Sequence, residues 1–87
     1  MYFTYILYSK AIDQFYIGQT HNIEERLLQH NSLRSKSTKK ANDWILVYKE
    51  VFENRSEAML REKEIKSKKS RKYIEKLIGS PDSYRES

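Results

Sequence analysis

The sequence has 87 residues, which suits one small domain with a single modest hydrophobic core. Hydrophobic residues make up 38% of the chain and aromatic residues 13%, so the composition is that of a folded protein and not of a disordered one. Cysteine is absent, which excludes disulfide bonds and thiolate metal sites, and the two histidines alone cannot complete a zinc tetrad. No apolar run is long enough to span a bilayer and no signal-peptide pattern opens the chain, so we expect a cytoplasmic protein.

The charge balance favours a polyanionic partner. Seventeen Lys and Arg residues against twelve Asp and Glu residues give a net charge of +5, and neutralising phosphates releases condensed counterions. The basic residues gather in a polar loop and in a later helical region. The candidate nucleic-acid contacts are Arg34, Lys36, Lys39 and Lys40 in the loop and Lys66 and Lys69 in the helical region. The alternative is a solvated surface that only keeps the protein in solution.

Two strands are predicted at the start of the chain. Residues Tyr2–Ser9 and Phe15–Gln19 are rich in aromatic and β-branched residues, and the short polar connection between them favours an antiparallel hairpin. Alternation places Tyr16 and Gly18 on one face of the second strand, and a glycine beside an aromatic residue often marks the close approach of a backbone or ligand. The alternative is that the tyrosines simply fill a thin core with their hydroxyls at its rim.

A helix and a third strand follow. Asn22, with Glu25 three residues later, has the pattern of an N-cap and its capping-box partner, so a helix should run to about Ser32. Residues 31–43 are rich in Ser, Lys and Asn and predict a loop. Trp44–Phe52 predicts the third strand.

The last third of the chain predicts two helices. Asn54 and Glu57 repeat the cap pattern and begin a helix that runs towards Lys68. Arg71–Ile78 predicts another helix, which the sequence Gly-Ser-Pro at 79–81 ends. The order β-β-α-β-α-α predicts an α/β (α+β) fold with one domain over residues 1–79, followed by a polar tail at 80–87.

The first helix carries charge on its buried side. Ile23, Arg26, Leu27 and His30 follow i, i+3, i+4, i+7 spacing and share one stripe. The two apolar members must face the sheet, so Arg26 and His30 should lie at or beside the buried edge.

A carboxylate lies on the buried side of the second helix. Ala58, Glu62 and Ile65 fall at i, i+4 and i+7. Burying part of a carboxylate costs free energy unless something pairs with it. Glu62 therefore forms either a structural ion pair with Arg26 or part of a site that uses its charge for chemistry.

Two short motifs resemble a known family. "FTY" at residues 3–5 and "YIG" at residues 16–18, with their tyrosines eleven residues apart and Arg26, His30 and a helical Glu62 following in order, resemble the paired signature of the GIY-YIG nuclease superfamily. The likeness covers about residues 1–78. The stretch from Trp44 onwards is similar to the small stand-alone members related to the N-terminal nuclease domain of the excinuclease C subunit. The resemblance implies a three-stranded sheet flanked by helices.

The same resemblance implies a site and a reaction. Tyr5 and Tyr16 match the signature tyrosines, Arg26 the catalytic arginine, His30 the histidine one turn later and Glu62 the metal-binding glutamate. The implied activity is a metal-dependent endonuclease that hydrolyses DNA phosphodiester bonds with one Mg²⁺ (or Mn²⁺) ion, in a setting such as DNA repair or recombination. A tyrosine would take the proton of the attacking water, with Tyr5 favoured and Tyr16 positioning the water or phosphate.

Three positions depart from the family pattern. Phe3 stands where the first motif has glycine, Gln19 stands where many members have a basic residue, and no asparagine lies near Ile74. A non-catalytic nucleic-acid-binding module on the same scaffold is therefore the alternative function. A protein-interaction domain is a third, and RNA is an alternative partner to DNA.

Overall fold

Three strands and three helices follow one another in the predicted β-β-α-β-α-α order. The computed structural model describes residues 1–32 and 40–79. Its elements are β1 (Tyr2–Ser9), β2 (Gln14–Thr20), α1 (Ile23–Asn31), β3 (Ile45–Phe52), α2 (Arg55–Ser67) and α3 (Arg71–Ile78). The α+β fold class is thus confirmed. Most of the predicted loop and the polar tail lie outside the described residues.

The sheet has β1 at its centre. Its strand order is β2-β1-β3, and both neighbours run antiparallel to β1. Tyr5 is paired in register with Gly18 on β2 and with Lys49 on β3. Between Ile6 and Leu7 the register with β3 shifts, which leaves Val47 as an extra residue.

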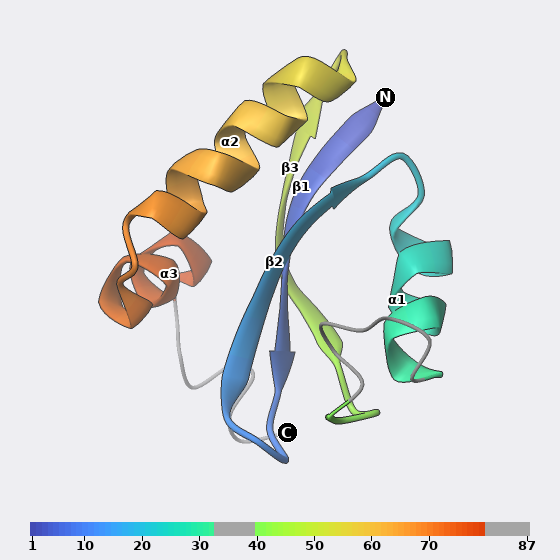
Figure 1. Ribbon diagram of the computed structural model, residues 1–87, viewed down its shortest axis with the longest axis vertical. Helices are drawn as coiled ribbons and strands as arrows, with labels where there is room; N and C mark the ends of the chain where they lie inside the picture. The colour runs from blue at the N-terminus through green and yellow to red at the C-terminus, as the bar shows by residue number, and fades with distance from the viewer. Residues whose placement is uncertain (33–39, 80–87) are drawn as a thin grey trace.

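The helices cover both faces of this sheet. Figure 1 shows α1 on one face and α2 with α3 on the other, while β2 forms the edge between them. The buried cluster on the α1 side consists of Tyr5, Leu7, Ala41 and Trp44. The buried cluster on the α2 side consists of Ile6, Ile17, Ile65 and Ile74. Because consecutive strand residues point to opposite faces, β1 supplies both clusters in alternation.

The predicted helix caps are confirmed. The Asn22 side chain accepts a hydrogen bond from the Glu25 backbone N–H at 3.1 Å, and Asn54 accepts one from Glu57 at 2.9 Å. Ser70 caps α3 in the same way by accepting from the Tyr73 N–H.

Several boundaries differ by one residue from the predictions, and two of the differences have identifiable reasons. The third strand begins at Ile45 and not at Trp44, because the Trp44 backbone makes two hydrogen bonds with the Asn31 side chain, at 2.7 and 2.9 Å. The second helix ends at Ser67, one residue before the predicted end, and Lys69 then takes the left-handed conformation with φ 47°. The chain turns at Lys69, and α3 begins two residues later at Arg71.

Candidate active site

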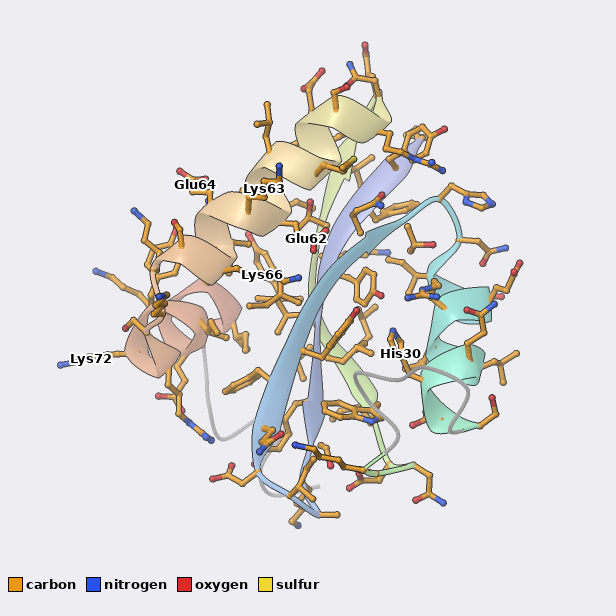
Figure 2. The ribbon with its side chains drawn as sticks, in the orientation of Figure 1. His30, Glu62, Lys63, Glu64, Lys66 and Lys72 are labelled. Atoms are coloured by element: carbon orange, nitrogen blue, oxygen red, sulfur yellow. The ribbon has the colours of Figure 1, made fainter. Side chains whose placement is uncertain are left out.

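The centre of the candidate site is a contact between Tyr5 and His30. The Tyr5 hydroxyl lies 3.0 Å from His30 Nε2, and the residues are 1% and 0% exposed. Tyr5 comes from the central strand, and His30 from the last turn of α1, where it points towards the sheet (Figure 2). The predicted stripe of α1 therefore does place His30 against the sheet.

Gly18 makes room for this contact. A Cβ atom at residue 18 would lie 2.6 Å from the Tyr5 hydroxyl oxygen and 2.8 Å from Tyr5 Cζ. Such distances are inside van der Waals contact, so the Tyr5 ring can lie across β2 only because residue 18 has no side chain. The close approach expected at this glycine is that of the Tyr5 side chain.

Burial keeps both members of the contact neutral. Burial raises the pKa of Tyr5 to about 12, Arg26 opposes this rise, and the negative charge of Glu62 adds a smaller amount to it. Burial, followed by the positive charge of Arg26, lowers the pKa of His30 to about 4. At neutral pH the hydroxyl therefore keeps its proton, and the imidazole is uncharged.

Arg26 and Tyr16 complete the α1 face of the site. The main cause that raises the pKa of Arg26 is its interaction with the Tyr5 hydroxyl, with a smaller contribution from Tyr16. Arg26 Nη1 also donates a hydrogen bond to Gln29 at 2.8 Å, which ties the guanidinium to the next turn of α1. The Tyr16 ring lies 4.7 Å from the His30 ring and 6.3 Å from that of Tyr5.

Glu62 approaches the site from the other face of the sheet. It projects from α2 towards β2 in Figure 2, and its negative charge contributes to the raised pKa of Tyr5. The expected alternative of an Arg26–Glu62 ion pair is wrong. In the described part of the chain, the ion-pair partner of Glu62 is Lys66, at 2.6 Å on the next turn of α2.

The candidate nucleic-acid contacts separate into two sets. Lys66 and Lys69 line a groove of about 350 Å³ beside β2, whose apolar floor includes Phe15, Ile17 and Ile74. Lys40 is exposed at the start of the segment that leads to β3. The remaining predicted contacts, Arg34, Lys36 and Lys39, lie outside the described residues.

Sequence reasoning missed Lys49. It is the register partner of Tyr5 on β3, so its Cα lies directly across from the buried tyrosine, and its ammonium lies 5.9 Å from the Phe3 ring. Strand alternation puts it on the α1 face, where it adds a cation at the border of the site. The pairing register of β1 with β3 would have found it, but no local pattern encodes that register.

The neutral His30 makes the stability of the fold depend on pH. Its folded pKa of about 4 lies below its ordinary value of 6.5, so between these pH values the unfolded chain binds more protons. The contribution of neutral His30 to the free energy of unfolding should be complete above about pH 6.5. As the pH drops to about 4, the free energy of unfolding should fall by up to about 3 kcal/mol. Urea unfolding across this range measures the slope.

A matched pair of variants assigns that slope to one residue. His30→Asn should flatten the pH dependence between about pH 4 and 6.5, because it removes the group that must charge on unfolding. Exposed His21 offers the control, as His21→Asn. A slope that survives in His30→Asn would show that another group titrates.

Comparison with known proteins identifies the family. The family model of the GIY-YIG catalytic domain matches residues 1–74. The chain belongs to the GIY-YIG family. A UPF0213 protein of Staphylococcus haemolyticus is 42% identical over 67 residues, which cover 76% of this chain and 80% of that protein. A UPF0213 protein of Clostridium perfringens is 41% identical over 81 residues, which cover 92% of this chain and 85% of that protein. A UPF0213 protein of Natronomonas pharaonis is 38% identical over 79 residues, which cover 90% of this chain and 91% of that protein.

These relatives are small stand-alone GIY-YIG proteins, and the name UPF0213 states no activity. No solved structure shows a significant match to the chain. Within the described residues, no helix is long and apolar enough to cross a membrane.

The residues of this GIY-YIG site fit a hard divalent ion. The described residues contain no cluster of three His, Cys, Asp or Glu side chains, but Mg²⁺ commonly takes one or two carboxylates and fills its other positions with water and phosphate. Glu62 offers such a carboxylate. On the same face of β2, the buried Gln19 Oε1 has no hydrogen-bond partner. Gln19 is paired with Thr4, whose hydroxyl donates to the Ala58 carbonyl, one turn before Glu62.

Proposed function

We propose that this protein is a metal-dependent endonuclease that hydrolyses DNA phosphodiester bonds. The observation that carries the proposal is the convergence of Tyr5, Tyr16, Arg26 and His30 against β2, with the charge of Glu62 acting on Tyr5 from the opposite face. Charged and polar groups held this close, with shifted pKa values, are typical of catalytic sites. Membership of the GIY-YIG family supports the same reaction class.

Each residue has a proposed role. Arg26 presents its planar fork of donors to the scissile phosphate, where negative charge grows in the transition state. Tyr5 takes the proton of the attacking water, while Tyr16 positions the water or the phosphate. The pKa of Tyr5 of about 12 means that its own proton must leave first, and the guanidinium of Arg26, which lowers this pKa, favours that loss. His30 Nε2, at 3.0 Å, holds the Tyr5 hydroxyl in place.

Glu62 is the proposed protein ligand of one Mg²⁺ or Mn²⁺ ion, and the unpartnered Gln19 Oε1 on β2 would be a further oxygen donor. When bound, the ion would polarise the phosphate and stabilise the leaving oxygen. The residues of this chain supply the positioning of the phosphate and the movement of the proton.

DNA is the proposed partner, with RNA as the second polyanion that the same surface suits. Lys66 and Lys69 on the groove, together with the net charge of +5, favour a phosphate backbone. The second candidate function is a nucleic-acid-binding module without catalysis. Two of the departures from the family pattern, Phe3 and the lack of an asparagine near Ile74, favour it. The partly buried carboxylate of Glu62 favours the enzyme, because binding a polyanion needs no such group.

Nicking of supercoiled plasmid tests the proposal. We expect the protein to convert supercoiled to open-circular plasmid with Mg²⁺ or Mn²⁺, and to stop when EDTA removes the ion, because one ion is needed to neutralise charge on the phosphate. Gel electrophoresis over time gives the rate. Salt-dependent binding without nicking would support the non-catalytic module. The absence of both binding and nicking would leave a protein-interaction domain.

A further inference from the structure

Lys66 contacts Glu62, the candidate metal ligand, and also lines the groove beside β2. Its ammonium nitrogen is 2.6 Å from Glu62 Oε2, and the side chains of Lys66 and Glu62 are 50% and 21% exposed. Lys66 also lines the groove of about 350 Å³ that runs beside β2. Both side chains project from the β2 side of α2 in Figure 2. One flexible cation therefore borders both the carboxylate and a surface suited to phosphate.

The helical period explains why these two side chains share one flank of α2. Ala58 and Ile65 are buried along the middle of the face that packs on the sheet. Arg61 lies on one flank, where it binds Glu50 of β3 through two atoms of its guanidinium. Glu62 and Lys66, one turn apart, lie on the opposite flank over β2. The ion pair of Glu62 is thus set by the helix and not by the rest of the site.

The groove has a further feature that concerns Lys66. Arg71, another basic residue on its rim, is paired with Asp13 at 2.6 Å and lies 5.1 Å above the Phe15 ring. The Arg71 guanidinium is therefore already paired with a carboxylate of the protein. Lys66 and Lys69 remain as the lining cations suited to a phosphate, and of these Lys66 is the one in contact with Glu62.

We propose that Lys66 is a positioning residue that competes with the divalent ion for Glu62 and contacts a phosphate of the nucleic acid when the ion is bound. The inference rests on the proposed function. An ammonium and a divalent ion repel each other on one carboxylate, and the ion pair is weak enough to exchange because the Lys66 side chain is half exposed. The compact charge of lysine, on a flexible stem, can move from one anion to another. Metal binding and nucleic-acid binding are then coupled through this one residue.

Titration with Mn²⁺ alone tests the competition without any activity measurement. Free Mn²⁺ is followed by electron paramagnetic resonance for the wild type, Lys66→Met and Lys63→Met. Lys63→Met is the matched control because Lys63 is on the same helix and exposed, and makes no ion pair within the described residues. Lys66→Met should bind Mn²⁺ about two- to fivefold more tightly than the wild type, since it removes the competitor, and Lys63→Met should not.

Binding of a short DNA duplex tests the second half of the proposal. Fluorescence anisotropy is measured in an Arg26→Ala background, so that the DNA is not cut. Adding Mn²⁺ should strengthen DNA binding more in the protein that keeps Lys66 than in the one that also carries Lys66→Met, because only lysine can be released to a phosphate.

The outcomes separate the two levels of the proposal. Equal Mn²⁺ affinities in Lys66→Met and Lys63→Met, or weaker binding in Lys66→Met, would overturn the competition. An equal gain in DNA affinity with and without Lys66 would overturn its transfer to phosphate. If Glu62→Gln binds Mn²⁺ as the wild type does, the proposed metal site itself is wrong and this inference falls with it.

Discussion

Replacing Arg26 with alanine should slow DNA nicking about 10³-fold while the protein stays folded. The guanidinium interacts with both tyrosines, and each of them raises its pKa. A fixed fork of donors stabilises the charge that builds on the phosphate in the transition state, and water cannot replace it at the same distance. The rate of plasmid nicking at saturating DNA measures the effect. Arg26→Lys should recover only part of the rate, because lysine restores the charge without the fork.

Arg55→Ala is the matched control for Arg26. Arg55 is exposed at the start of α2 and lies 5.2 Å above the Tyr2 ring, so its removal costs the protein the same charge. Nicking should stay near the wild-type rate in this variant. If the two alanine variants lose the same activity, Arg26 contributes only to the general attraction of DNA and the proposed role is wrong.

Replacing Glu62 with glutamine should reduce nicking about 10²- to 10³-fold. Glutamine has nearly the same shape but carries no charge, so it removes the carboxylate proposed to hold the ion and leaves α2 otherwise unchanged. The ion pair with Lys66 is lost as well, but such a pair contributes little to stability at this exposure. Nicking rates measured over a range of Mn²⁺ concentrations should show that excess ion restores activity only in part.

Glu64→Gln provides the control on the same helix. Glu64 is two residues further on and pairs with Arg61 on the opposite flank, away from β2. The same chemical change there should leave the nicking rate and its dependence on Mn²⁺ as in the wild type. Full activity in Glu62→Gln would exclude Glu62 as the metal ligand.

The secondary structure of this protein is encoded locally. The aromatic and β-branched content of residues 2–9 and 15–19, and the Asn–Glu cap patterns at 22–25 and 54–57, predicted elements that the structure confirms to within about two residues. These signals are local, because strand propensity belongs to each residue and a cap joins residues three apart. The predicted start of the third strand at Trp44 was wrong, because the Trp44 backbone binds the side chain of Asn31, which is 13 residues away in the sequence.

The candidate site is only partly encoded in this way. The spacing of Arg26 and His30 placed both on the sheet side of α1, and the structure buries His30 against Tyr5. Spacing along the sequence could not predict which side chains of α2 interact with residues on the α1 face of the sheet. Glu62 was equally compatible with a pair to Arg26, and the position of α2 over the edge strand β2 gave it Lys66 instead.

The sequence by itself determined the order of the elements, the family and the residue types of the site, because these depend on short patterns. Only the tertiary structure decided which of those residues act on one another. It paired Tyr5 with both Gly18 and Lys49, and it brought the Tyr5 ring over a residue where even one added carbon would lie 2.6 Å from its hydroxyl. Such contacts come from strand register and from packing across the sheet, and these are set by the whole core and not by any local segment.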